Sequence, residues 1–307
     1  MKGRRLFFGF YFLGIFGMYI ASAQDLDPRA YIRIPIKTTT LIAGAGYSFG
    51  NVVTDPSIAI KNVKADVQVA SVGVARSFKL AGLTAQAMAV LPYSWARATG
   101  EVNQQNQKVT RAGFADARMR VSVLFLGAPA VTMEEFKKTP PAKTILGASI
   151  NIVAPTGQFF SDKLINLGTN RWGFRPELAL SQHVGKKWLL DVYTGVWLFT
   201  ENKHFYPGES VRGQEPMGAF QAHISYTIKP NFWVAYDATF YTGGASTVDG
   251  IKNDDRQSNF RGGFTAVFPT GKFSSLKFAF SKGAIVRVGQ DFTSFSLGWQ
   301  RTWFKMK

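Results

Sequence analysis

The chain has 307 residues, of which only 18% are charged, and it is rich in glycine and phenylalanine, with 30 and 27 residues. This composition favours an all-β protein, and the absence of cysteine excludes disulfides, thiolate metal sites and cysteine nucleophiles. The formal net charge is +17, but the basic residues are scattered and match no nucleic-acid-binding motif, so we predict no nucleic-acid partner.

Residues 1–23 have the pattern of a secretory signal peptide, with Lys2, Arg4 and Arg5 ahead of an apolar stretch over residues 6–20. Ala21-Ser22-Ala23 forms a small-x-small cleavage site. The apolar stretch is shorter than the ~20 residues of a membrane-spanning helix. We therefore predict a cleaved signal peptide over 1–23, a periplasmic N-terminal lead-in over 24–37 and an outer-membrane β-barrel over 38–307.

Strand-sized runs separated by turn residues follow the leader. Many of them exceed the five or six residues that are usual in soluble strands and reach the ~9–11 that a tilted membrane strand needs. We predict twelve strands, near residues 38–50, 60–78, 80–98, 110–126, 143–156, 171–184, 186–202, 214–229, 231–242, 256–269, 273–284 and 290–304.

Polar and apolar residues alternate with a period of two in these runs. In residues 187–199, for example, Leu190 and Val192 share one face, and Asp191 and Tyr193 lie on the other. Charges on one strand face are typical of a membrane barrel with a wet interior, whereas a soluble sandwich, the alternative fold, turns its polar face outward. Aromatic residues near the run ends resemble interfacial girdles: Tyr93, Trp95, Trp172, Trp188, Trp233, Tyr241, Trp299 and Trp303.

The connections between the runs alternate in length. Short turns follow the even-numbered runs, and long polar connections follow the odd-numbered ones, as expected for periplasmic turns and outer loops. The exception is 127–142, where Thr132 as N-cap and Glu135 three residues later predict one helical turn. The last run ends in Trp303-Phe304, which is typical of strands that the barrel-assembly machinery recognises, so we predict this machinery, outer-membrane lipid and lipopolysaccharide as partners.

If the apolar faces contact lipid, the opposite faces line the lumen. Arg175 and Glu177, two residues apart, are the clearest pair on such a face. A set of mixed charges supports either a ligand path or an ion-paired plug that stabilises a narrow barrel, and both interpretations stay open. The predicted lumen charges are Asp66, Asp116, Arg118, Arg120, Arg175, Glu177, Asp191, His223, Asp237, Arg261 and Lys277.

A lipid hydrolase is a third possibility. The three histidines are His183, His204 and His223, and the nearest serines, Ser181 and Ser225, each lie two residues from a histidine, ~7 Å along a strand. No Gly-x-Ser-x-Gly elbow at a strand-to-helix turn is present, because the match at Gly46-Tyr47-Ser48-Phe49-Gly50 lies within the predicted strand over 38–50. We therefore predict no enzymatic activity, no metal site and no cofactor, and we interpret Asp249, Asp254 and Asp255 as a solvated acidic loop rather than a calcium site.

Several short motifs resemble those of a known family: Ala154-Pro155-Thr156-Gly157, Asn166-Leu167-Gly168-Thr169-Asn170-Arg171-Trp172, Gln214-Glu215-Pro216, Tyr241-Thr242-Gly243-Gly244 and Gln257-Ser258-Asn259-Phe260-Arg261-Gly262-Gly263. Their order and spacing resemble the outer-membrane proteins grouped under the meta-pathway of phenol degradation, often labelled transporters. The resemblance implies a β-barrel and a role in uptake of aromatic or other hydrophobic compounds. It adds Gln257 and Asn259 to the candidates for the outer half of the lumen.

Together these observations predict a monomeric, twelve-stranded antiparallel barrel in the outer membrane of a Gram-negative bacterium. Its predicted function is passive uptake of a small hydrophobic or aromatic solute. The alternative is a plugged structural or adhesive surface barrel that transports nothing.

Overall fold

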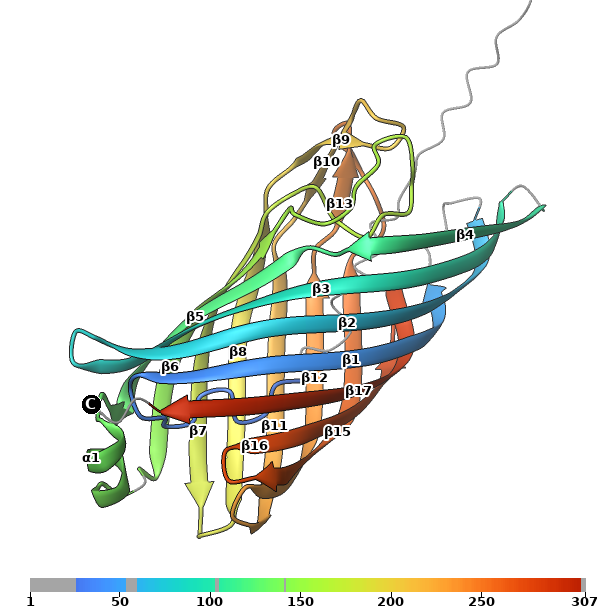
Figure 1. Cartoon of the computed structure of the whole chain (residues 1–307). Helices are drawn as coiled ribbons and strands as arrows, with labels where there is room; N and C mark the ends of the chain where they lie inside the picture. Colours follow the sequence, from blue (N-terminus) through green and yellow to red (C-terminus); the bar gives the residue numbers. More distant parts are fainter. Residues whose placement is uncertain (1–25, 54–59, 103–104, 141, 305–307) are drawn as a thin grey trace, which may run out of the picture.

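The computed structural model describes residues 26–53, 60–102, 105–140 and 142–304, which form a closed antiparallel β-barrel (Figure 1). The predicted leader over 1–23 and the last residues, 305–307, lie outside the described residues. The barrel strands are β1 (Thr38–Val53), β2 (Ile60–Leu80), β3 (Leu83–Val102), β4 (Gln105–Phe114), β5 (Ala117–Pro129), β6 (Thr144–Ala154), β7 (Gly173–Val184), β8 (Trp188–Phe199), β11 (Met217–Lys229), β12 (Phe232–Gly243), β15 (Gln257–Gly271), β16 (Ser274–Ile285) and β17 (Gly289–Phe304).

The ring closes because β1 pairs with both β2 and β17. The described barrel sheet has thirteen strands, but β4 and β5 share one position, because β3 pairs with β5 through its first half and with β4 through its second half. The ring therefore has twelve positions, which confirms the predicted all-β barrel. The predicted run over 110–126 is the one that divides, at Ala115-Asp116.

The inner and outer faces of the wall carry different side chains. Ser181, Ser225 and Thr265 on the inner face are 0% exposed, whereas Leu178 and Tyr236 on the outer face are 59% and 60% exposed. Apolar side chains outside and hydroxyls inside suit a wall that meets lipid on one side only. This arrangement confirms the period-two prediction for these strands.

Three residues face opposite to the prediction. The alternation predicts Asp66 inside, but Val63, Ala65 and Val67 are the buried residues of this part of β2, and Asp66 lies on the outer face. There its carboxylate accepts a hydrogen bond from the exposed Tyr47 hydroxyl at 3.0 Å. Trp233 and Tyr241, predicted in an interfacial girdle, turn inward instead, on the face of β12 that carries the buried Asp237. The Arg29 guanidinium lies 4.5 Å from the Trp233 ring centroid.

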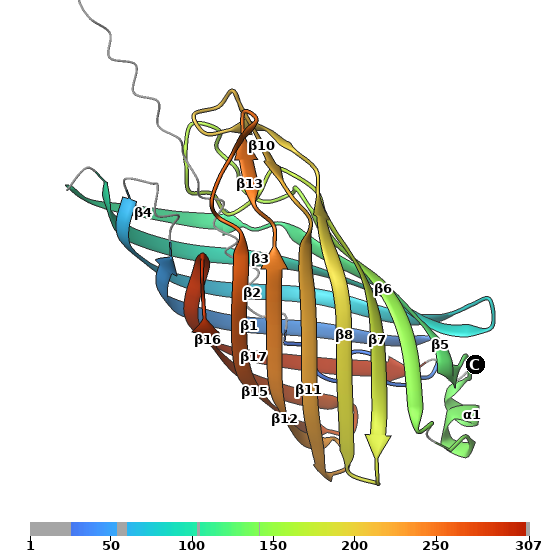
Figure 2. The ribbon, with the colours of Figure 1, turned by 180° about the vertical axis from the view of Figure 1, so that it is seen from behind.

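The two ends of the barrel differ, as the connection lengths predict. At the short-turn end, residues 81–82, 185–187, 230–231 and 272–273 join neighbouring strands. At the opposite, long-loop end, four short strands form a second sheet above the barrel (Figure 1). The sequence predicts loops there, and the structure instead has β9 (Asn202–Phe205), β10 (Ser210–Gln214), β13 (Ser246–Val248) and β14 (Ile251–Lys252). Figure 2 shows β7, β8, β11 and β12 from behind, rising to this sheet.

The connection between β5 and β6 contains α1 (Met133–Lys138), the predicted helical turn. The Thr132 hydroxyl accepts from the Glu135 N–H at 3.4 Å, and the Glu135 carboxylate accepts from the Thr132 N–H at 2.7 Å, which completes a capping box. This backbone hydrogen bond and a second one from the Thr132 hydroxyl lower the pKa of Glu135. Within the described ranges, no helix is long and apolar enough to cross a membrane.

Candidate functional site in the barrel lumen

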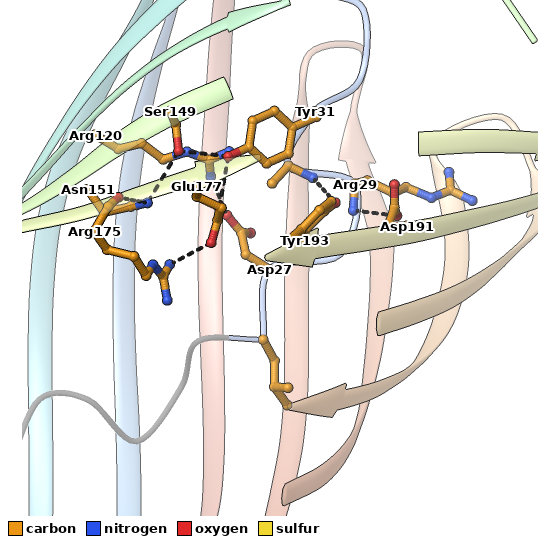
Figure 3. A network of polar contacts seen from close by, with 12 residues as sticks. Asp27, Arg29, Tyr31, Arg120, Ser149, Asn151, Arg175, Glu177, Asp191 and Tyr193 are labelled. Carbon is orange, nitrogen blue, oxygen red and sulfur yellow. Dashed lines mark hydrogen bonds and ion pairs between the residues drawn. The ribbon is translucent and has the colours of Figure 1, made fainter. Parts of the chain in front are cut away.

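A stretch of the N-terminal chain, residues 26–37, runs inside the barrel before it joins β1, and we call it the inner segment (Figure 3). The sequence predicts this stretch as a periplasmic lead-in and assigns it no contact with the wall. Most of its polar contacts join residues that lie between 40 and 251 positions later in the chain. No local pattern reports contacts at such separations, which is why sequence reasoning missed them.

Asp27 bridges opposite sides of the ring. Its carboxylate lies 3.2 Å from an Arg120 nitrogen on β5 and 3.3 Å from the Lys277 amine on β16. These two strands are five positions apart in the ring, so the inner segment crosses the lumen instead of following the wall. The Asp27 side chain is 50% exposed, so a water-accessible space remains beside the segment.

Arg29 and Ala30 attach the inner segment to a third part of the wall. The Arg29 N–H donates to Asp191 on β8 at 3.1 Å, and its guanidinium donates to Thr227 on β11 at 2.8 Å. The Ala30 N–H donates to the Tyr193 hydroxyl at 3.2 Å. Asp191 also accepts a hydrogen bond from Ser181. The predicted lumen residue Asp191 therefore holds backbone of the inner segment.

Tyr31 makes the most enclosed contact of the segment. Its hydroxyl lies 2.7 Å from Glu177 on β7 and 2.7 Å from Ser149 on β6, and Arg120 stacks 4.4 Å from its ring centroid. Gly147 leaves room for this ring, because a Cβ at that position would lie 2.7 Å from a Tyr31 ring carbon. Aromatic packing and two short hydrogen bonds therefore hold the middle of the segment against the wall.

Arg175 and Glu177, the pair that the sequence singles out, face the lumen and each other. Their charged atoms lie 3.3 Å apart, and both side chains are almost wholly buried. The Arg175 guanidinium also stacks on Trp197 of β8, 5.0 Å from its ring centroid. Since Glu177 accepts from Tyr31 as well, this ion pair joins the wall to the inner segment (Figure 3).

His223 and Asp237 form a second buried pair, on neighbouring strands β11 and β12. His223 Nδ1 lies 2.7 Å from one Asp237 oxygen, and the Thr265 hydroxyl donates to the other at 2.6 Å. His223 Nε2 and the adjacent inward groups of Gln221 and Thr239 are buried without a hydrogen-bond partner among the described residues. Polar groups of this kind are the ones that a polar solute or ordered water can satisfy.

Asp116 anchors the long connection over residues 155–172 instead of facing a solute. Its carboxylate accepts from the Gly157 N–H at 2.9 Å, the Thr169 N–H at 2.8 Å and the Thr169 hydroxyl at 2.7 Å. Gly157 and Gly168 lie in contact, and a Cβ on Gly168 would come 2.7 Å from Gly157 backbone. The two motifs around these glycines thus describe one folded loop.

Replacing Asp116 with alanine should free this loop. Three hydrogen bonds to one carboxylate are lost together, so we expect trypsin to cleave at the exposed Lys163 about tenfold faster or more. Time-resolved digestion of the folded protein measures the rate. Asp249→Ala is the matched control, because this carboxylate accepts the Val211 N–H in a different loop. Equal rates for both variants would contradict the anchoring role.

The other predicted lumen residues contact the barrel wall itself or lie on its inner face. Arg261 donates to the Phe292 carbonyl at 2.9 Å and to the Ser281 hydroxyl at 3.1 Å. Asn259 binds the Val288 carbonyl and the Arg287 N–H, and it also donates to Gln257. Arg118 lies on β5 two residues from Arg120 and shares its inward face. These contacts hold the turn between β16 and β17 and its neighbouring strands.

An apolar stretch of the inner wall went unpredicted. It lies at the long-loop end, where buried side chains of β1, β2, β3 and β17 pack with the loop residue Leu167. Its residues are Val52, Val63, Ala65, Val67, Ala98, Leu167 and Phe292. The signal was present in the alternation of β2, but only the closed barrel shows that this apolar face is the inner one.

Among the described residues, neither of the two serines nearest to a histidine in the sequence forms a hydrogen bond with a histidine. Within the described part of the chain, the Ser181 hydroxyl donates to Asp191, the Ser225 hydroxyl has no partner, and His223 contacts Asp237. No group of three or more His, Asp or Glu residues in the described ranges is arranged to hold a metal ion. The inner groups can donate and accept hydrogen bonds and pair charges.

Comparisons with known proteins place the chain among barrels. Residues 43–302 match the family model described as "Putative MetA-pathway of phenol degradation". The COG4313 outer membrane channel from Pseudomonas putida F1 is similar in structure, with a TM-score of 0.76 and 21% identity, over 91% of this chain and 100% of that one. The transport unit of the autotransporter AIDA-I from Escherichia coli has a TM-score of 0.51 and 10% identity, over 91% and 92% of the two chains. No curated protein matches the sequence.

Proposed function

Because the chain belongs to the MetA-pathway of phenol degradation family, we propose that it is a bacterial outer-membrane channel for passive uptake of small hydrophobic or aromatic compounds. The proposed location has the short-turn end in the periplasm and the long-loop end outside the cell. The proposed surroundings are outer-membrane lipid and lipopolysaccharide, and uptake down a gradient needs no cofactor.

One observation carries this proposal. The inner segment crosses the lumen but does not fill it, since the Asp27 carboxylate between Arg120 and Lys277 stays half exposed. A polypeptide held by side-chain contacts, rather than by pairing into the sheet, can be displaced without breaking the barrel. We propose that displacement of this segment widens the path. The proposed path follows the inward-facing residues that the sequence predicts, among them Arg175, Glu177 and His223.

The apolar inner wall supports a hydrophobic solute. Val67 and Phe292 are packed under the loop residue Leu167, so a small aromatic compound that enters at the long-loop end contacts this cluster when the loop moves aside. Burial of its apolar surface there stabilises it by about 25 cal/mol per Å². Deeper in the lumen, the unpartnered polar groups of Gln221 and His223 are placed to bind a single hydroxyl group of the solute.

A bulky side chain in the lumen tests the proposal. Gln221 faces inward and Ala222, the next residue, faces outward, so Gln221→Trp and Ala222→Trp add the same group to opposite faces. We expect Gln221→Trp to reduce uptake of labelled phenol several-fold in cells that lack the native gene, with Ala222→Trp close to the unchanged chain. Outer-membrane levels of both variants provide the control for assembly.

Equal uptake by both variants and by cells without the protein would refute transport. In that case the plugged structural barrel, which the crossing of the lumen by residues 26–37 favours, is the better interpretation.

A further inference from the structure

A groove lies on the outer face of the wall, where β1, β2, β3 and β4 run side by side toward the long-loop end (Figure 1). It has a volume of about 680 Å³ and is open on one side. The side chains of Tyr47, Asp66, Trp95 and Arg97 are among those that line it. Their sequence neighbours Val67 and Ser94 are buried on the inner face, so the groove faces the membrane side of the wall and not the lumen.

Three positive side chains gather on the long-loop side of this groove. Lys64 on β2 and Lys108 on β4 both lie opposite Thr99 of β3, and Arg97 is two residues from Thr99 on the same face. Neighbouring strands are about 5 Å apart, and residues two apart in a strand are separated by about 7 Å, so the backbones of the three cations lie within roughly 10 Å of one another. All three side chains are exposed.

The carboxylates beside these cations are already bound to neutral groups. Asp66 accepts a hydrogen bond from the Tyr47 hydroxyl at 3.0 Å, and Glu101 accepts one from the Asn62 amide at 2.9 Å. The three cations, in contrast, form no hydrogen bond or ion pair with any residue in the described ranges. Three cations beside two carboxylates leave this part of the outer face positively charged.

The opposite side of the groove is aromatic and then apolar. The Trp95 and Tyr93 ring centroids are 4.8 Å apart, and Tyr93 and Phe114 are 5.2 Å apart. Further toward the short-turn end, Leu91 and Val72 lie opposite each other and are 40% and 53% exposed. Aromatic rings beside exposed apolar residues mark the boundary between headgroups and hydrocarbon, so the cations lie at the level of lipid headgroups.

We propose that this groove binds the phosphorylated sugar headgroup of lipid A, the lipid that anchors lipopolysaccharide in the outer leaflet. Its phosphates accept charge-assisted hydrogen bonds from Lys64, Arg97 and Lys108. Gln68 and Thr110, which also line the groove, are placed to bind sugar hydroxyls. The acyl chains then lie along the apolar wall below the aromatic rings. The choice of the outer leaflet rests on the proposed orientation of the barrel, but the site does not depend on solute uptake.

Native mass spectrometry of the full-length protein in detergent tests the site. The probes are diphosphorylated lipid A, the same lipid without its phosphates, and phosphatidylglycerol. We expect lipid A to bind at least about tenfold more tightly than either, because the charge-assisted hydrogen bonds are lost or reduced in number. Equal binding of the dephosphorylated lipid overturns the phosphate site, and equal binding of phosphatidylglycerol overturns the choice of lipid A. Displacement of lipid A by equimolar inorganic phosphate would show a site for free phosphate instead.

Arg97→Gln combined with Lys108→Gln should weaken lipid A binding by about tenfold or more, since two of the three cations are lost. Arg256→Gln combined with Lys203→Gln is the matched control, because it removes an exposed arginine and an exposed lysine elsewhere at the long-loop end. Equal lipid A affinity in the two double variants overturns the role of the groove. Phenol uptake is a separate measurement and should be the same in both, so loss of the lipid site and failure of the proposed channel function are distinguishable.

Discussion

Replacing Asp27 and Tyr31 together with alanine is expected to raise the single-channel conductance of the barrel several-fold. Asp27 joins β5 and β16 across the lumen, and Tyr31 binds Glu177 and Ser149. Without these contacts the inner segment keeps its attachments at Arg29, Ala30 and Arg33 but loses those that cross the lumen centre. Planar-bilayer recordings of the purified variant and the unchanged chain measure the difference.

Ile32→Ala is the control for this experiment, because Ile32 lies in the same segment with its side chain exposed. The chain contains no cysteine, so Asp27→Cys places a single thiol in the lumen. An anionic thiol reagent should modify this position, whose side chain is half exposed, and should react far more slowly with Tyr31→Cys at a buried position. Unchanged conductance in the double variant would mean that the inner segment is not the constriction.

Replacing Glu177 with alanine is expected to destabilise the folded barrel by about 3–5 kcal/mol. The change leaves the buried Arg175 guanidinium without its ion-pair partner and the buried Tyr31 hydroxyl without one of its two partners. A charge that loses its partner in a buried site keeps its desolvation cost and loses the compensating attraction. Equilibrium unfolding in urea from lipid vesicles measures the free energy of unfolding.

Two further variants define the cause of this loss. Glu215→Gln removes one partner of the exposed pair with Lys252, and it should change stability by less than about 1 kcal/mol. Arg175→Met combined with Glu177→Leu removes both charges and should recover most of the loss, because no charge is then buried alone. A double variant as unstable as Glu177→Ala would assign the effect to the Tyr31 hydrogen bond instead.

Local sequence patterns predict which residues share a strand face, whereas contacts between distant parts of the chain do not follow from them. Alternation along residues 187–199 correctly puts Asp191 and Tyr193 on one face of β8, and Arg175 with Glu177 on one face of β7. Periodicity of this kind depends only on strand geometry, so it can be read from neighbouring residues. The predicted capping box of Thr132 and Glu135 and the short turns are correct for the same reason.

The outward orientation of Asp66 could not be predicted from this periodicity. Alternation shows that Asp66 is opposite to Val67, but not which of the two faces the lumen. In β2 the inner face is apolar at the long-loop end, because the loop residue Leu167 packs against it from inside. Where the strand extends beyond the lipid, a polar residue on the outer face is in contact with water. The rule that polar residues point inward therefore fails there.

The sequence by itself therefore determined the barrel, its twelve strand positions and the residues that share each face, because strand periodicity and turn composition are local properties. Only the tertiary structure decided that residues 26–37 cross the lumen and that Asp116 anchors a loop. Each of these arrangements joins side chains tens to hundreds of residues apart, such as Asp27 with Lys277. Closure of the ring brings them together, and no pattern within a single strand encodes that closure.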